Sequence, residues 1–214
     1  MAWRNHSRKI WRFLREDSAA SWVANVVIAF IVIRYLFYPL FGLMLGTSFP
    51  IVAVVSESME HGTNRDILCG QNIRDFQYSF QNYWKVCGSW YETQGIKSES
   101  FQKFPFSNGF NTGDVIILWR ATPANLEIGD ILIFQGSKPQ PIIHRIVKIY
   151  TEKGQIFYQT KGDHNGESIA GQQGETRIGL ERVYGQGILR IPYLGWVKIL
   201  FVEAVRPLGI TIQR

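Results

Sequence analysis

The feature of this chain that most constrains its fold is an apolar run over residues 23–45, VANVVIAFIVIRYLFYPLFGLML. The residues in this run that fall outside the apolar and aromatic set are Asn25, Arg34, Pro39 and Gly42. A helix of this length is long enough to span a bilayer. We therefore predict a transmembrane anchor over residues 21–47, followed by one globular domain over residues 48–214.

Arg34 is the main argument against a membrane span. A central arginine costs about 2.5–3.5 kcal/mol on insertion scales, while each central Leu, Ile, Phe or Val returns about 0.3–0.6 kcal/mol. More than a dozen such residues lie in the run and outweigh the arginine. Because no A-x-A-like site follows Leu45, we expect an uncleaved anchor rather than a signal peptide.

The charge near the N-terminus predicts an orientation. The chain has a formal net charge of +6, and residues 1–17 supply half of it, with five basic side chains against two acidic ones. Basic residues beside a membrane span favour the cytoplasmic side. We therefore expect residues 1–20 to be a cytoplasmic basic tail and the main domain to be extracytoplasmic, in a single-pass cell-membrane protein. This interpretation of the charge leaves no reason to expect nucleic-acid binding.

Beyond residue 47, the sequence changes to short β-branched and aromatic runs bounded by Gly, Pro, Asn and Asp, which are typical of strands. These runs cover residues 49–55, 114–119, 130–135, 141–150, 155–162 and 182–191. The links between the later runs are too short for crossover helices, so parallel β-α-β units are not expected. The predicted fold is mainly β, with an antiparallel, barrel-like sheet.

Residues 61–112 lack this alternation and are rich in aromatic and polar groups, which predicts an inserted segment with short helices. It holds the two cysteines of the chain, Cys69 and Cys87. An extracytoplasmic location would permit a disulfide between them, although two free thiols remain an alternative. A zinc site would need two further ligands, and His61 offers at most one, so we expect no metal and no cofactor.

The C-terminal stretch IPYLGWVKILFVEAVRPLGI is apolar but is interrupted by charged residues before it reaches a spanning length. We expect it either to pack into the core or to lie against the membrane surface.

The stretch VVSESMEHG, residues 54–62, places Ser56 and Ser58 just after the first strand-like run. Side chains two residues apart on an extended backbone share a face. The Ser58 backbone N–H and the Ser56 hydroxyl could then stabilise the same oxyanion. A nucleophilic serine also needs a base and a group that orients the base. Without these partners, the pattern is ordinary polar chemistry at a strand end.

His144 and Asp163 are the candidate partners. His144 lies in PIIHRIVKI, a run where imidazole has low propensity, so it is either a hydrogen-bonded core histidine or a positioned base. Asp163, in TKGDHNGE at the end of the next run, could accept the Nδ1–H of His144 and leave Nε2 facing Ser58. The same Gly-Asp-His-Asn sequence is also common in turns.

The combination of motifs resembles the type I signal peptidases of the archaeal and endoplasmic-reticulum kind. The blocks that carry the resemblance are SESME, GDVIIL, GDILIF, PIIHRIV, TKGDHN and GQGILRIPYLGWV, in that order, from residue 54 to about residue 201. The resemblance implies that Ser58 is the nucleophile. It also implies that His144 occupies the position where the bacterial branch uses a lysine as the base.

The identity of the acid departs from the family pattern. Asp163 matches the first acidic residue of the family's GDNN-like block, but relatives carry a further Asp six residues later, where this chain has Ile169. The acid role is therefore assigned to Asp163, with Glu167 or Glu175 as substitutes.

The resemblance implies a membrane-anchored serine endopeptidase that cleaves N-terminal signal peptides from exported preproteins, after small residues. Its expected partners are preproteins, the lipid bilayer and the protein-export machinery. Two alternatives remain open. One is a Ser-Lys peptidase that uses Lys148 or Lys161 as the base, and the other is a non-catalytic, membrane-tethered peptide-binding module.

Overall fold

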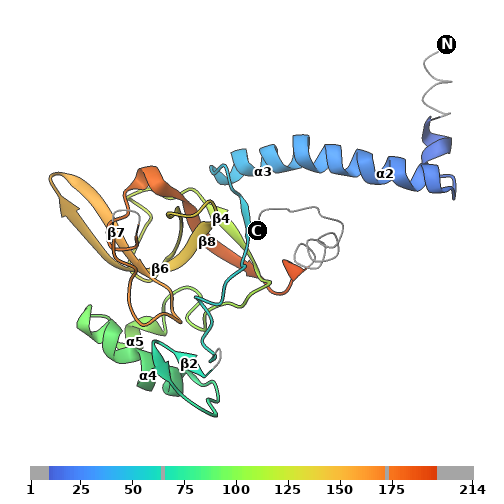
Figure 1. The fold of residues 1–214 in the computed structure, drawn as a ribbon. Coiled ribbons are helices and arrows are strands. Elements are labelled where there is room, and N and C mark those ends of the chain that lie inside the picture. Colours follow the sequence, from blue (N-terminus) through green and yellow to red (C-terminus); the bar gives the residue numbers. More distant parts are fainter. Residues whose placement is uncertain (1–9, 64–65, 172–173, 197–214) are drawn as a thin grey trace. The chain divides into compact units, whose positions relative to one another are not determined.

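The computed structural model describes residues 10–63, 66–171 and 174–196. These residues fall into two compact units, one before and one after the peptide bond between Ser48 and Phe49 (Figure 1).

The first unit includes a long helix that covers most of the predicted anchor. The helix consists of α2 (Ala19–Val32), the π-helical segment η1 (Ile33–Phe37) and α3 (Tyr38–Leu45). Ser18 caps its start by accepting a hydrogen bond from the backbone N–H of Ser21, and Gly46 ends it in the left-handed conformation. Arg34 lies in the π-helical segment, with its guanidinium 5.6 Å from the centroid of the Tyr35 ring.

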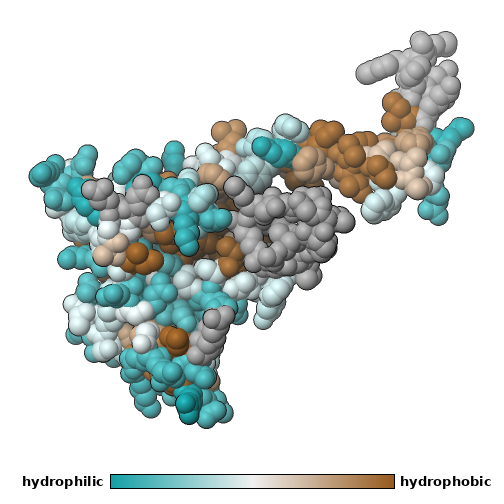
Figure 2. Space-filling view, in the orientation of Figure 1, coloured by the Kyte–Doolittle hydropathy of each residue, from teal (hydrophilic) through white to brown (hydrophobic). Residues whose placement is uncertain are grey.

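By length and composition, the continuous helix Ala19–Leu45 is the one helix among the described residues that could cross a membrane. Its apolar side chains are exposed along its length, and Figure 2 shows a brown surface over α2, with pale and teal atoms mixed in toward α3. In water such a surface would be unfavourable, which is consistent with a lipid environment.

The second unit is built on a six-stranded sheet in which all neighbouring strands are antiparallel. The strands are β1 (Ile51–Ala53), β4 (Val115–Trp119), β5 (Ile131–Gln135), β6 (Pro141–Glu152), β7 (Gln155–Lys161) and β8 (Val183–Ile191), in the order β1-β4-β8-β5-β6-β7. A short 3-10 helix, η2 (Leu180–Arg182), leads into β8. The predicted mainly β, antiparallel fold is confirmed.

Strand β6 lies between two apolar cores, and this arrangement decides which partners its side chains meet. Ile146 packs in one cluster with Leu132 and Tyr158, whereas Val147 packs in another with aromatic residues of the insertion. Successive side chains on a strand point to opposite faces. His144 and Arg145, earlier on the same strand, are therefore directed to different sides of the sheet.

The insertion contains a small hairpin, β2 (Ile67–Leu68) and β3 (Gln71–Asn72), and two helices, α4 (Phe80–Thr93) and α5 (Ser98–Phe101). These elements gather on one side of the second unit (Figure 1). Ser79 caps α4 by accepting a hydrogen bond from the backbone N–H of Asn82. The buried face of α4 includes Tyr83, Cys87 and Tyr91, at a spacing of one residue per turn.

Cys69, in the turn of the β2–β3 hairpin, forms a disulfide with Cys87 on α4. The bond closes a loop whose ends are 18 residues apart. Replacing both cysteines by alanine is expected to lower the free energy of unfolding by about 3 kcal/mol, because the open chain gains conformational entropy when unfolded. The melting temperature, followed by circular dichroism in detergent, should fall by about 6–12 °C. An unchanged melting temperature would show that the disulfide does not stabilise the fold.

Two sequence predictions fall largely outside the described residues. The basic tail begins with residues 1–9, and most of the C-terminal apolar stretch lies in residues 197–214.

Candidate active site

Ser58 lies in the turn that follows β1, and its side chain is half-buried. Its hydroxyl is 3.1 Å from that of Ser56, which is exposed, so the two serines are neighbours as the sequence predicts. The Ser58 carbonyl accepts a hydrogen bond from the backbone N–H of His164 at 2.9 Å. This bond fastens the serine turn to the loop that follows β7.

His144 is buried on β6, where it pairs in register with Leu132 of β5. Its Nδ1 forms a close contact with Oε1 of Glu175, which is also buried. An ionised carboxylate can only accept hydrogen bonds, so this contact assigns the proton to Nδ1. In the neutral ring, Nε2 is then free to accept a proton.

Glu175 is held by groups on both sides of its carboxylate. Oε1 also accepts a hydrogen bond from the Thr160 hydroxyl at 3.2 Å, and Oε2 accepts one from the backbone N–H of Ile169 at 2.8 Å. The backbone N–H of Glu175 in turn donates to the Ile169 carbonyl at 2.7 Å. Glu175 is therefore paired with the backbone of Ile169, which is the position where relatives carry the second Asp. This pairing brings the Glu175 side chain to His144.

Gly162 brings the histidine and the serine turn together. A Cβ atom at this glycine would lie 2.7 Å from His144 Nε2 and 2.7 Å from the Ser58 carbonyl oxygen. Any side chain would collide with both groups, so the close approach requires glycine. In the described structure, the Ser58 hydroxyl is within hydrogen-bonding distance of Ser56 rather than of His144 Nε2.

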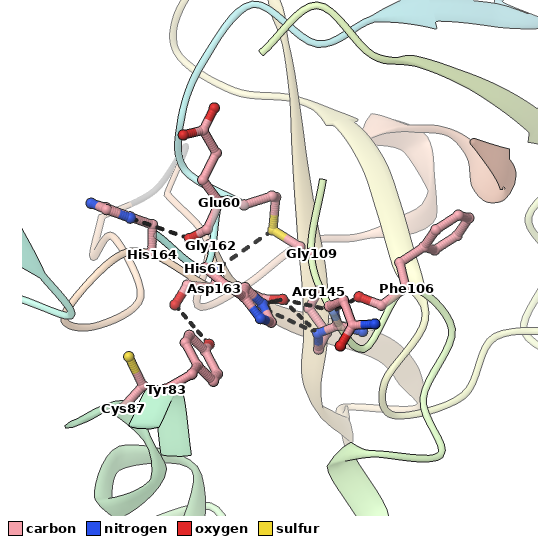
Figure 3. A network of polar contacts seen from close by, with 12 residues as sticks. Glu60, His61, Tyr83, Cys87, Phe106, Gly109, Arg145, Gly162, Asp163 and His164 are labelled. Atoms are coloured by element: carbon pink, nitrogen blue, oxygen red, sulfur yellow. Dashed lines mark hydrogen bonds and ion pairs between the residues drawn. The ribbon is translucent and has the colours of Figure 1, made fainter. Parts of the chain in front are cut away.

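Asp163 is fully buried, and its carboxylate is occupied by groups other than His144. Arg145 donates to Oδ1 from Nε at 2.9 Å and to Oδ2 from Nη2 at 2.7 Å. Tyr91 donates to Oδ1 at 3.0 Å, and His61 Nε2 contacts Oδ2 at 2.9 Å. Figure 3 shows part of this network, with Asp163 between Arg145 and His61.

Arg145 satisfies all five of its N–H donors inside the protein. Besides Asp163, it donates to the carbonyls of Pro105, Phe106 and Gly129 at 2.7–2.8 Å. Burial by itself would raise the pKa of Asp163. The Arg145 charge and the hydrogen bonds from His61 and Arg145 outweigh burial, so the pKa is held far below its usual range. Asp163 is therefore an ionised, structural carboxylate at neutral pH.

His61 completes the network as a neutral group. Burial lowers the pKa of His61, although its hydrogen bond to Asp163 acts in the opposite direction. Its Nδ1 is buried with no hydrogen-bond partner among the described residues, so a proton there would be unsatisfied. The ring stacks on Tyr83 with centroids 3.9 Å apart. His61 thus donates from Nε2 and acts as a packing residue.

The partner of His144 Nδ1 is therefore Glu175, and the expected contact with Asp163 is not formed. The reason is the alternation of side chains along β6 and β7. Arg145 pairs in register with Lys161, and Asp163 two residues later meets the same side of the sheet as Arg145. His144 points to the opposite side. Glu167, the other proposed substitute, is exposed. The catalytic role of each carboxylate stays a prediction.

The two lysines of the alternative mechanism lie in different surroundings. Lys148 is exposed. Lys161 is fully buried, donates to the Gly162 carbonyl at 3.0 Å, and has its ammonium 4.6 Å from the centroid of the Tyr91 ring. Burial lowers the pKa of Lys161 from 10.5 to about 8. Its contacts lie on the insertion side of the sheet, away from the side to which His144 points.

The pKa of Lys161 predicts how stability changes with pH. Between the folded value of about 8 and the unfolded value of about 10.4, the unfolded chain binds more protons, so stability rises with pH. The free energy of unfolding should increase by about 2 kcal/mol between about pH 7.5 and 9.5. Lys161→Met should abolish this rise in urea titrations, whereas Lys148→Met should retain it. A rise that persists in Lys161→Met would assign it to another group.

Groups of three or more His, Cys, Asp and Glu side chains that could hold a metal ion are absent from the described part of the chain. The arrangement that remains is a serine turn, a histidine with one accepting nitrogen, and a carboxylate on its other nitrogen. These groups are the components of nucleophilic serine catalysis.

The sequence is similar to several curated proteins. It is 32% identical over 99 residues to the signal peptidase complex catalytic subunit SEC11 of Eremothecium gossypii, which covers 44% of this chain and 59% of that protein. It is 31% identical over 98 residues to SEC11 of Pyricularia oryzae, covering 44% and 57%. It is also 32% identical over 95 residues to SEC11C of Homo sapiens, covering 42% and 50%. No family model matches the chain.

The matches thus span between 50% and 59% of the length of these relatives. Over the matched segment, the chain is a homologue of the catalytic subunits of signal peptidase complexes, and the resemblance to type I signal peptidases of the endoplasmic-reticulum kind is confirmed.

Proposed function

We propose that this protein is a membrane-anchored serine endopeptidase that cleaves N-terminal signal peptides from exported preproteins. The observation that carries the proposal is the His144–Glu175 pair, whose ring presents Nε2 to Gly162 beside the main chain of Ser58. The homology to signal peptidase catalytic subunits supports the choice of substrate.

In the proposed mechanism, the Ser58 hydroxyl turns from Ser56 toward His144 Nε2 when a substrate binds. Catalytic hydrogen bonds are often long or unformed before substrate arrives. Nε2 accepts the Ser58 proton as the oxygen attacks the scissile carbonyl, and then delivers that proton to the leaving amine. Water activated by the same nitrogen hydrolyses the acyl-enzyme and regenerates Ser58.

Glu175 acts as the acid of this triad in our proposal. It accepts the Nδ1–H bond, holds the ring in the productive tautomer and stabilises the imidazolium that forms. The Ser58 N–H and the Ser56 hydroxyl stabilise the oxyanion, and the exposed position of Ser56 beside the nucleophile supports this role. Asp163 is instead committed to Arg145.

The proposed setting is a bilayer, with the N-terminus cytoplasmic and the second unit extracytoplasmic. A signal peptide is itself an apolar segment held in the membrane, so an anchored enzyme meets it with fewer degrees of freedom to lose. The apolar helix Ala19–Leu45 supports the anchor. A link to the export machinery follows as a further part of the proposal.

The function can be tested with the full chain in phospholipid vesicles. A preprotein with an intact signal peptide is added, and the products are identified by mass spectrometry. We expect one new N-terminus that follows a small residue, and no cleavage of a matched preprotein in which the small residues before that position are replaced by large ones. Binding of the preprotein to these vesicles without cleavage would favour the peptide-binding module.

A further inference from the structure

Helix α4 of the insertion packs against the loop that follows β7. We call its buried face, with Tyr83, Cys87 and Tyr91, the wall. Two tyrosines of α4, two helical turns apart, both reach Asp163 in this loop. Tyr83 donates to its backbone carbonyl at 2.9 Å, and Tyr91 donates to its carboxylate at 3.0 Å. Neither tyrosine is exposed, so both bonds are shielded from water. Figure 3 shows Tyr83 of α4 directed at the backbone of Asp163.

The disulfide fixes α4 to the same loop. Cys87 lies between the two tyrosines on the buried face of α4, and its partner Cys69 donates a backbone N–H bond to the His164 carbonyl at 2.9 Å. The Cys69 sulfur lies 3.3 Å from the Asp163 carbonyl oxygen. The α4 helix, the hairpin turn and the loop are thus connected at residues 163 and 164.

This wall reaches His144 by two routes. Gly162, next to Asp163 in the chain, is the residue that faces His144 Nε2. Arg145, next to His144 on β6, is bound to the Asp163 carboxylate through two of its nitrogens. A displacement of Asp163 would therefore move a residue in front of the histidine ring and a residue beside it in the strand.

Tyr83 and Tyr91 can hold Asp163 in place at every physiological pH. Burial raises the pKa of Tyr83 and of Tyr91 well above the usual value of 10, so both phenols remain hydrogen-bond donors at any pH that a cell provides. Their bonds go to Asp163, whereas the bonds of Glu175 lie on the His144 side of the sheet. The tyrosine hydroxyls therefore act on Asp163 and make no hydrogen bond to Ser58, His144 or Glu175.

Resting on the proposed function, we propose that Tyr83 and Tyr91, held in place by the Cys69–Cys87 disulfide, are positioning residues for His144. The insertion then affects the rate of peptide cleavage through the loop that follows β7, without contacting the substrate.

The test uses the variant Tyr83→Phe/Tyr91→Phe, which removes both hydroxyls and keeps both rings and their packing. Tyr78→Phe is the matched control, because Tyr78 is an exposed tyrosine of the insertion whose hydroxyl bonds to Asn108. Cleavage kinetics are measured in vesicles at a temperature well below each variant's melting point. In parallel, the ¹⁵N chemical shifts of His144 are recorded on histidine-labelled protein in micelles.

We expect kcat of the double variant to fall by about 10- to 100-fold with KM unchanged, because misplaced catalytic groups slow the chemical step while substrate contacts persist. The His144 shifts should change in the double variant and not in Tyr78→Phe. Cys69→Ala/Cys87→Ala removes the disulfide without altering a tyrosine. It should change kcat and the His144 shifts in the same direction as the double tyrosine variant.

Two results would overturn this inference: a double variant with wild-type kcat and wild-type His144 shifts, or a fall in kcat with unchanged His144 shifts. Failure of the proposed function has a different signature, which is a wild-type protein that cleaves no preprotein. Even then, the His144 shifts report whether the insertion positions the histidine.

Discussion

Ser58→Ala is expected to lower kcat for preprotein cleavage by about 10⁶-fold, the size of loss seen when a triad nucleophile is removed. The variant keeps the fold, because the Ser58 bond to His164 is made by its backbone carbonyl and survives the change. The rate is measured in vesicles under single-turnover conditions, with the cleaved product quantified by mass spectrometry. KM should change little, since a hydroxyl contributes little to substrate binding.

Ser56→Ala is the matched control for this variant. It removes a neighbouring hydroxyl 3.1 Å away from that of Ser58 but leaves the nucleophile in place. We expect a smaller loss, of about 10²–10³-fold, as for one oxyanion donor. Equal losses in the two variants would show that the serines act as one polar pair, and a larger loss in Ser56→Ala would reverse their assigned roles.

Glu175→Gln is expected to lower kcat by about 10⁴-fold, the loss that follows when a triad acid becomes an amide. A neutral amide stabilises the imidazolium poorly, and its NH₂ group can donate to His144 Nδ1 and so favour the wrong tautomer. In that orientation the amide oxygen still accepts from the Ile169 backbone N–H, and the Thr160 hydroxyl can rotate to accept from the NH₂ group, so the loop should keep its position. Cleavage rates and melting temperature are measured together.

The control for this second prediction is Glu167→Gln, which removes an exposed carboxylate from the same loop. It should cleave at the wild-type rate. If Glu175→Gln also retained the wild-type rate, His144 would not depend on this carboxylate, and the acid would have to be sought elsewhere.

Much of the fold follows from local sequence patterns. The β-branched runs bounded by turn residues correspond closely to the observed strands, and the apolar run to the helix Ala19–Leu45. The proximity of Ser56 and Ser58 also follows from the sequence, because residues two apart on an extended chain share a face. These features depend on neighbours in the chain.

The partner of His144 could not be found in the same way. The sequence places Asp163 near the end of the strand after His144, but its carboxylate meets Arg145, one residue further along and on the other side of the sheet. The one available signal was the alternation of side chains along β6 and β7, which places His144 and Arg145 on opposite faces of the sheet. Glu175 is placed beside His144 by backbone hydrogen bonds to Ile169, and no local sequence pattern reveals these bonds.

The buried face of α4 in the insertion could be predicted in part from the sequence. Tyr83, Cys87 and Tyr91 recur every four residues, which is the spacing of one helix face. That spacing predicts a buried stripe but not what it meets. The contacts with Asp163 arise from tertiary packing and required the structure.

The central claim is that Ser58, His144 and Glu175 act as one catalytic unit, and the double variant Ser58→Ala/Glu175→Gln tests it most directly. From a typical kcat of about 10 s⁻¹, Ser58→Ala alone should cleave at about 10⁻⁵ s⁻¹. If the residues form a unit, Glu175→Gln adds no further loss once the nucleophile is gone, and the double variant cleaves at the same residual rate. If the losses multiplied and enzyme-dependent cleavage disappeared, Glu175 would act independently of Ser58, which would contradict the proposed triad.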